Sequence, residues 1–292
     1  MKDTFIFTEA YNCGLILKKC IQTYHLYHDY EINIFASEDD FKHIPYHKNN
    51  IFHNICEYQD VMQSYKNGHE GTAILFSKII NNSFTKCNKI IHFDSDIIFR
   101  DESINIISEK LNNGYDLVGP YRCYKNNLNG RTDLKNLTDV VQTYVFGFNK
   151  EKIDLHPLLP LMCQGIYNPY NHPILDFFDP VSFSILKNNG KIFFLDPDDY
   201  GGMDKNGNKN NKYGIINETI DFGNKLMHFA GVGSGMSFYN DKNNKTNEFY
   251  MNWSKSQYVM YQKLFYNEDF PGDYDKNKYK ILKIIKAFEI KK

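Results

Sequence analysis

Short runs of apolar residues alternate, over the first hundred positions, with longer segments whose apolar residues recur every three or four positions. Short runs bounded by polar residues are typical of buried β-strands, and the longer spacing is typical of helices that pack one face on a core. The pattern predicts strands at residues 4–8, 31–36, 50–55 and 89–99, and helices at about 13–27 and 71–81. This alternation predicts an α/β fold with a mostly parallel, doubly wound sheet and flanking helices.

The same pattern continues less regularly towards the C-terminus. It predicts strands at residues 116–119, 142–148 and 191–195, helices at 104–111 and 179–186, and polar loops at 124–138 and 201–214. Residues 1–253 are expected to form one domain, and residues 254–292 a C-terminal helical extension on or beside it. Residues 276–292 form a basic amphipathic segment. Such a helix usually docks its apolar face on its own domain, and contact with an anionic membrane surface is the alternative.

Composition narrows the classes of partner and compartment. The chain has 292 residues, 42% of them hydrophobic, and 34 basic residues against 35 acidic ones. This balance argues against nucleic acid as a partner, because nucleic-acid capture needs a clustered basic surface. No secretory signal and no apolar stretch of membrane-spanning length is visible, so a cytoplasmic protein is expected. The six cysteines show no zinc-binding spacing, which favours free thiols, although an even count leaves disulfides open.

Two carboxylates interrupt the apolar segment 89–99. Asp94 and Asp96 are one residue apart, so in a continuous strand their side chains point to the same side. Neighbouring carboxylates repel each other and are costly to bury, and a divalent cation such as magnesium, calcium or manganese relieves that cost. Ligands of parallel sheets bind beyond the carboxyl ends of the strands, where the turns at 8–12 and 37–40 also lie. The segment therefore predicts an acidic metal site at one edge of the sheet.

A histidine followed by a glycine repeat is the second chemical signal. His228 precedes Gly231-Val232-Gly233-Ser234-Gly235. Glycine allows the backbone to approach a phosphate closely and to aim amide hydrogens at it. A metal-binding histidine followed by a diphosphate-binding loop is a coherent unit.

Taken in order, these motifs resemble a known family. The residues that carry the resemblance are Thr8-Glu9-Ala10-Tyr11-x-x-Gly14, Lys78, His92-Phe93-Asp94-Ser95-Asp96 and His228-Phe229-x-Gly231, over roughly residues 3–235. The chain resembles GT-A glycosyltransferases, and most of all glycosyltransferase family 8, the group that contains glycogenin and bacterial galactosyltransferases. The resemblance implies a GT-A (Rossmann-like) fold and transfer of a hexose from a nucleotide-sugar, with UDP as the expected nucleotide, to an unknown acceptor with retention.

The resemblance also implies roles for individual residues. The ligands of Mn²⁺, or Mg²⁺, would be Asp94, Asp96 and His228. The residues around the nucleotide-sugar would be Phe7, Thr8, Tyr11, Lys78, Ser95, Gly231, Gly233 and Ser234, with Tyr11 stacked on the uracil and Lys78 near the diphosphate. The residues around the transferred sugar would be Asp176, Asp179 and Gln142. Lys78 is equally compatible with a solvated helix position, and Asp179 with a helix N-cap.

One departure from the family and two alternatives stay open. The Lys-Pro-Trp that usually follows the family's histidine is replaced by Ser234-Gly235-Met236, so the lysine that contacts the diphosphate is absent. One alternative is a non-catalytic nucleotide-sugar or glycan-binding module that keeps the two aspartates. The other is a metal-dependent phosphohydrolase. Haloacid-dehalogenase-type phosphatases carry their Asp-x-Asp on the first strand, whereas the pair here lies on a middle strand.

Overall fold

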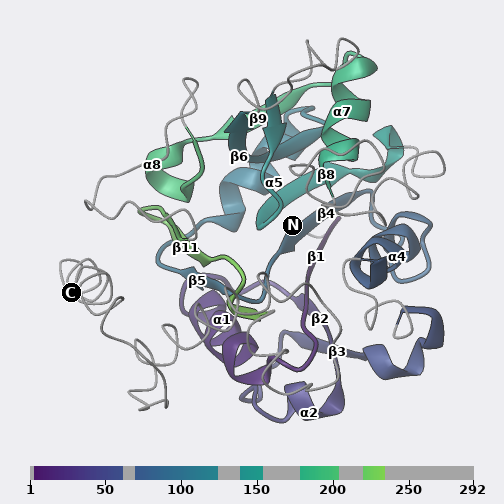
Figure 1. Ribbon diagram of the computed structural model, residues 1–292, viewed down its shortest axis with the longest axis vertical. Coiled ribbons are helices and arrows are strands. Elements are labelled where there is room, and N and C mark those ends of the chain that lie inside the picture. Colours follow the sequence, from purple (N-terminus) through teal and green to yellow (C-terminus); the bar gives the residue numbers. More distant parts are fainter. Residues whose placement is uncertain (1–2, 62–69, 124–138, 154–177, 204–219, 234–292) are drawn as a thin grey trace, which may run out of the picture.

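An eight-stranded sheet forms the centre of the molecule. The computed structural model describes residues 3–61, 70–123, 139–153, 178–203 and 220–233. Within them the strands lie in the order β3-β2-β1-β4-β8-β6-β7, and β9 pairs with β6 (Figure 1). The bounds are β1 Thr4–Glu9, β2 Ile32–Ala36, β3 Asn50–Asn54, β4 Lys89–Phe93, β6 Leu117–Cys123, β7 Asp139–Val141, β8 Val145–Asn149 and β9 Ile192–Leu195.

Most of these strands point the same way. Strands β1 to β4 pair in parallel, whereas β8 is inserted between β4 and β6 and runs antiparallel to both. β9 is parallel to β6, and β7 is antiparallel to it. The predicted Rossmann-like α/β fold, with a mostly parallel sheet and flanking helices, is therefore confirmed. The antiparallel insertion of β8 was not part of that prediction.

The prediction of one strand over residues 89–99 is wrong. β4 ends at Phe93, the chain turns through Asp94–Asp96, and β5 (Ile97–Phe99) joins a second sheet in the order β10-β11-β5. The other strands of that sheet are β10 (Ile220–Phe222) and β11 (Leu226–Phe229). In the sequence, the apolar residues before and after the turn look like one strand, because β4 and β5 are both buried. The two aspartates thus lie where one sheet passes into the other.

The strand predicted at residues 142–148 also begins later than expected. Residues 142–144 form the connection between β7 and β8, and the predicted strand 142–148 begins only at Val145. This connection carries Tyr144 to the carboxyl end of β4, where the carbonyl oxygen of Tyr144 accepts a hydrogen bond from the N–H of Asp94 (2.8 Å).

Helices cover both faces of the sheet (Figure 1). Their bounds are α1 Gly14–Tyr27, α2 Glu38–Phe41, α4 Glu70–Ile80, α5 Ile104–Asn112, α7 Asp179–Lys187 and α8 Pro197–Tyr200, with short 3-10 turns η1 Ile55–Glu57 and η2 Lys150–Lys152. Side chains alternate along each strand, so Ile6 and Ile91 pack with α1 and α5 while Phe7 and Ile90 pack with α4 and α7. Burial of these two apolar layers is the main stabilising term of the fold.

The turns after β1 and β2 are bonded to each other. Buried Asp40 accepts hydrogen bonds from the N–H of Asn12 (2.9 Å) and the hydroxyl of Ser37 (2.7 Å). Ser37 also caps the short helix α2, which replaces the polar turn expected at residues 37–40. Gly14 lets α1 begin against this turn, because a Cβ there would lie 2.8 Å from the carbonyl oxygen of Asp40.

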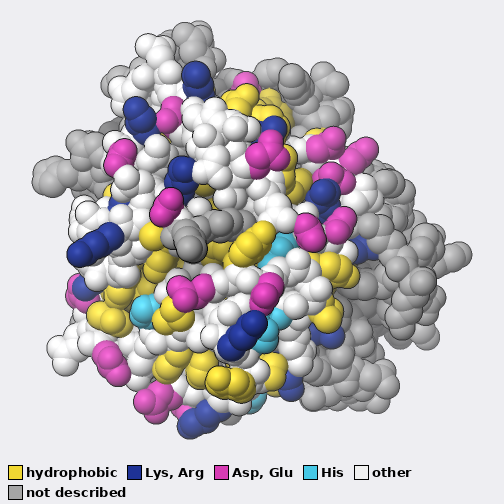
Figure 2. Space-filling model, turned by 180° about the vertical axis from the view of Figure 1, so that it is seen from behind, with side chains coloured by type: hydrophobic (Ala, Val, Ile, Leu, Met, Phe, Trp, Pro, Cys, Tyr) yellow, Lys and Arg dark blue, Asp and Glu magenta, His cyan; other side chains and the backbone are white. Residues whose placement is uncertain are grey.

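Several predictions concern residues outside the described part. The loops at 124–138 and 204–214 and the C-terminal extension from 254 all belong to this group, and so does the domain boundary at 253. Within the described part, no helix combines the length and the apolar character that crossing a bilayer requires. The thiols of Cys13, Cys20, Cys56 and Cys87 are free. Basic and acidic side chains are interspersed on the face seen in Figure 2, as the balanced composition predicts.

Candidate metal and donor site

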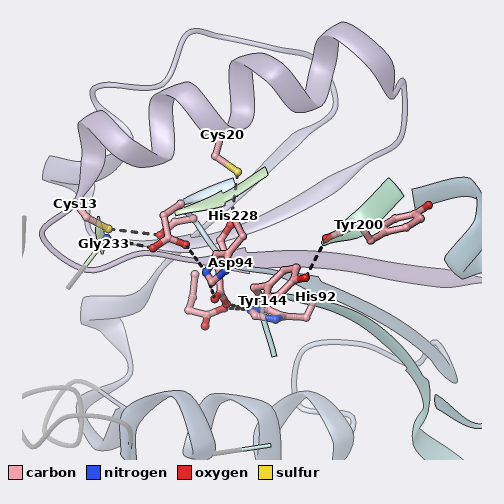
Figure 3. Close-up of polar contacts among 11 residues, drawn as sticks. Cys13, Cys20, His92, Asp94, Tyr144, Tyr200, His228 and Gly233 are labelled. Atoms are coloured by element: carbon pink, nitrogen blue, oxygen red, sulfur yellow. Dashed lines mark hydrogen bonds and ion pairs between the residues drawn. The ribbon is translucent and has the colours of Figure 1, made fainter. Parts of the chain in front are cut away.

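Three side chains from two sheets meet at the carboxyl end of β4. Asp94 follows β4, Asp96 precedes β5, and His228 lies on β11 directly opposite Ile97 of β5. The Nε2 atom of His228 is 3.6 Å from Oδ2 of Asp94 and 3.5 Å from Oδ1 of Asp96 (Figure 3). The antiparallel register between β5 and β11 brings these residues together across more than a hundred positions of sequence.

The two carboxylates sit in different surroundings. The Asp94 side chain is 31% exposed, whereas that of Asp96 is buried. Oδ2 of Asp96 accepts a hydrogen bond from the N–H of Gly233 (3.3 Å), and Oδ1 accepts none from the described residues. Burial raises the pKa of Asp96, and the nearby His228 opposes that rise. A buried carboxylate oxygen without a hydrogen-bond donor is unfavourable unless a cation or water reaches it.

The donor set fits a divalent cation. Two ligands at right angles around an ion, each about 2.1 Å from it, are about 3.0 Å apart. The separations of 3.5 and 3.6 Å are too long for good hydrogen bonds and close to this ligand spacing. Two carboxylate oxygens and one imidazole suit manganese or magnesium by ligand type. Asp94, Asp96 and His228 are accordingly one of two groups in the described part that could hold an ion.

Tyr144 supports this group and has no signal in the sequence. Its ring stacks on His228, with centroids 4.3 Å apart and planes inclined by 15°. Its hydroxyl donates to the carbonyl oxygen of Tyr200 (2.9 Å). The contact arises from the path of the β7–β8 connection, which the apolar pattern does not show.

The second group that could hold an ion consists of Glu9, His92 and Asp94, so it shares Asp94 with the first. Nε2 of His92 lies 2.7 Å from Oε2 of Glu9 and 3.8 Å from Oδ1 of Asp94. Phe7 of β1 pairs with His92 of β4, so Glu9 and Asp94 occupy equivalent places two residues later on adjacent parallel strands. In the sequence, Glu9 and His92 stand out only as parts of the motifs that carry the resemblance. The parallel β1–β4 pairing was the available signal.

The predicted glycine loop is described as far as Gly233. Gly231 has a positive φ of 76°, which favours glycine. The N–H of Gly233 points at Asp96, and a Cβ at this position would lie 3.5 Å from Oγ of buried Ser95. Ser95 also contacts the Cys13 sulfur at 3.8 Å. Ser234 lies outside the described residues.

The residues predicted around the nucleotide base are mostly buried. Phe7 is 0% exposed and packs between Phe35 and Phe76, so it presents no surface to a ligand. Thr8 is equally buried, and its Oγ1 has no hydrogen-bond partner in the described part. Tyr11 is half-buried in the turn after β1.

Three further predicted residues lie in other surroundings. Lys78 on α4 forms an ion pair with Asp60 (2.9 Å). Gln142 is buried and donates from its side chain to the carbonyl oxygen of Tyr121 (3.3 Å). Asp179 is buried at the start of α7. Asp176 lies outside the described residues.

No family model matches the chain, and neither does any curated protein. Solved structures show remote likenesses. Mouse xyloside xylosyltransferase 1 in its apo form is 12% identical, with 67% of this chain and 86% of that chain covered and a TM-score of 0.46. The galactosyltransferase LgtC in complex with donor and acceptor sugar analogs is 13% identical, with 86% and 95% covered and a TM-score of 0.46. A 4-diphosphocytidyl-2C-methyl-D-erythritol synthase from Anaerococcus prevotii DSM 20548 is 10% identical, with 71% and 93% covered and a TM-score of 0.37.

Proposed function

We propose that this chain is a GT-A glycosyltransferase, related to family 8, that transfers a hexose from a UDP-sugar and depends on Mn²⁺ or Mg²⁺. The observation that carries the proposal is the convergence of Asp94, Asp96 and His228, with Oδ1 of Asp96 buried and given no hydrogen-bond donor by the residues that the structure describes. Their order along the chain is that of the motifs quoted above. Retention at the transferred sugar is part of the same proposal.

Each residue has a task that follows from its place. Asp94, Asp96 and His228 would hold the cation, which neutralises the negative charge that develops on the departing nucleoside diphosphate. Tyr144 keeps the His228 ring in its plane through the stacked contact. Tyr11, at the carboxyl end of β1, is the residue that we assign to the base. Phe7 is left out of this assignment because it is buried in the core.

Release of the nucleotide from a panel of UDP-, GDP- and CMP-sugars, measured with and without Mn²⁺, tests the proposal. We expect slow hydrolysis of a UDP-hexose that requires the metal and is lost in Asp96→Asn. Asp39→Asn is the matched control, because Asp39 of α2 is an exposed carboxylate that forms an ion pair with Lys42. Metal-independent hydrolysis, or full activity in Asp96→Asn, would refute the proposal.

One observation favours a second candidate, a nucleotide-sugar-binding module without turnover. The family's Lys-Pro-Trp is absent from the sequence, and Lys78 is engaged by Asp60. A site with fewer cations around the diphosphate stabilises the leaving group less. Tight metal-dependent binding of a UDP-sugar, with no release of UDP across acceptors, would establish this candidate instead.

A further inference from the structure

His92 is an imidazole in an apolar enclosure. Its side chain is 0% exposed, and the rings of Phe7, Phe76 and Phe146 surround it at centroid distances of 4.9, 5.0 and 5.1 Å. Its Nδ1 atom is buried and has no hydrogen-bond partner among the described residues. All polar contacts that the structure gives this ring are therefore made at Nε2.

These surroundings assign the ring hydrogen. A hydrogen on Nδ1 would be buried without an acceptor, which is unfavourable, so the N–H is at Nε2. Two carboxylates face that N–H. Oε2 of Glu9 lies at 2.7 Å and accepts it, whereas Oδ1 of Asp94, at 3.8 Å, is beyond hydrogen-bonding distance.

Asp94 is thus placed between two histidines. Its Oδ1 faces His92, and its Oδ2 faces His228 of the candidate metal group at 3.6 Å. Without an acceptor at position 9, the nearest charged acceptor for the buried N–H of His92 would be Oδ1 of Asp94. A hydrogen bond there would require Asp94 to turn towards the sheet interior and away from the cation.

We propose that Glu9 is a positioning residue for the metal site: it accepts the N–H at Nε2 of His92 and so keeps Oδ1 of Asp94 from turning towards His92 and away from the cation. This inference rests on the proposed function for its metal, and it adds a role for a residue outside the predicted set of metal ligands. The 2.7 Å separation between Glu9 and His92 is that of a charge-assisted hydrogen bond, which argues against a second cation between them.

Three variants distinguish the effect of a hydrogen-bond acceptor at position 9 from the effect of its negative charge. Glu9→Ala removes both, Glu9→Gln keeps an oxygen acceptor without the charge, and Glu9→Ala/His92→Leu removes the competing N–H as well. Mn²⁺ affinity, measured by the paramagnetic resonance signal of free Mn²⁺, should fall roughly 10- to 100-fold in Glu9→Ala, the usual loss on removing a partner that orients a ligand. Glu9→Gln should lose less. The double variant should bind Mn²⁺ more tightly than Glu9→Ala.

Crystal structures of the metal-free variants give a readout that needs neither metal nor activity. We expect Nε2 of His92 within about 3.2 Å of Oδ1 of Asp94 in Glu9→Ala, and the wild-type separation in Glu9→Gln. An unchanged separation in Glu9→Ala overturns the inference. So does equal Mn²⁺ affinity in wild type and Glu9→Ala, no recovery in the double variant, or two Mn²⁺ bound per wild-type chain. A wild type that binds no Mn²⁺ while Glu9→Ala shows the new contact would refute the proposed function and leave the positioning of Asp94 standing.

Discussion

Tyr144 lies flat against His228, with ring centroids 4.3 Å apart and planes inclined by 15°. The same residue accepts the N–H of Asp94 through its carbonyl oxygen and donates its hydroxyl to the carbonyl of Tyr200. One residue between β7 and β8 thus contacts Asp94 through its backbone and His228 through its ring. The geometry of the metal group depends on this contact as well as on the strands themselves.

Tyr144→Leu should weaken Mn²⁺ binding, because the imidazole of His228 loses its flat support. An aromatic pair contributes about 1 kcal/mol beyond its buried area, so we expect a loss of roughly fivefold in affinity by calorimetric titration. Tyr144→Phe keeps the ring and should bind Mn²⁺ like the wild type. It should lower the free energy of unfolding by about 1 kcal/mol, because the Tyr200 carbonyl loses its donor. Equal Mn²⁺ affinities in Tyr144→Leu and Tyr144→Phe would exclude the supporting role.

Asp96→Asn should abolish Mn²⁺ binding without lowering the stability of the metal-free protein. Without metal, burial raises the pKa of Asp96 and disfavours its charged form, so a neutral amide should leave the melting temperature unchanged or higher. Wild-type protein at a Mn²⁺ concentration of 100 times the dissociation constant should gain about 2.7 kcal/mol, and the variant should gain none. Thermal unfolding with and without Mn²⁺ measures both effects. A strongly destabilised metal-free variant would instead indicate that Asp96 has a structural task.

The sequence predicts the elements of this fold better than their directions. Strand and helix positions follow from local apolar spacing, which is why β1, α1 and α4 begin and end within one residue of their predicted bounds. The turn at Asp94–Asp96 and the antiparallel direction of β8 depend on pairing with distant strands, and a buried run looks the same in either case. Local spacing therefore gave no reason to divide residues 89–99.

In the candidate site too, the sequence predicts some residues and gives no sign of others. Asp94, Asp96 and His228 are predictable from the sequence, because carboxylates and imidazole are groups that bind a cation. The stacked contact of Tyr144 and the pairing of Glu9 with His92 are products of chain path and strand register. Such contacts become predictable only once the neighbouring strands are known.

Gly14→Ala should destabilise the fold at the carboxyl end of β1. A Cβ at this position would lie 2.5 Å from Cδ2 of His43, 2.8 Å from the carbonyl oxygen of Asp40 and 2.9 Å from its Cα. Backbone atoms cannot move aside as a flexible side chain can, so we expect a loss of about 1–3 kcal/mol in urea unfolding. Gly114→Ala is a useful comparison, because its added Cβ would meet nothing within 4 Å and its φ of 83° is the remaining source of strain. A Gly14→Ala protein as stable as wild type would show that α1 and α2 can separate freely.

His28 should make the protein less stable in mild acid. The ring is buried against Tyr24 and Phe99, and its Nε2 accepts the N–H of Ser103 at 3.4 Å, which requires that nitrogen to be unprotonated. Burial lowers the pKa of His28 to about 4, with His25 acting in the same direction and Asp101 opposing it.

The sign of the pH effect follows from this shift. In the unfolded chain His28 takes up a proton near its ordinary pKa of about 6.5, whereas the folded chain resists it until about pH 4. The stabilisation from neutral His28 is therefore complete above about pH 6.5 and is lost as the pH falls towards 4, by at most about 3 kcal/mol. His28→Gln keeps an acceptor for Ser103 and cannot titrate, so its unfolding free energy should fall less between pH 7 and pH 4 than that of the wild type. The other titrating groups are common to both proteins and cancel in the difference. Parallel pH profiles in urea unfolding would mean that His28 is protonated in the folded protein without penalty.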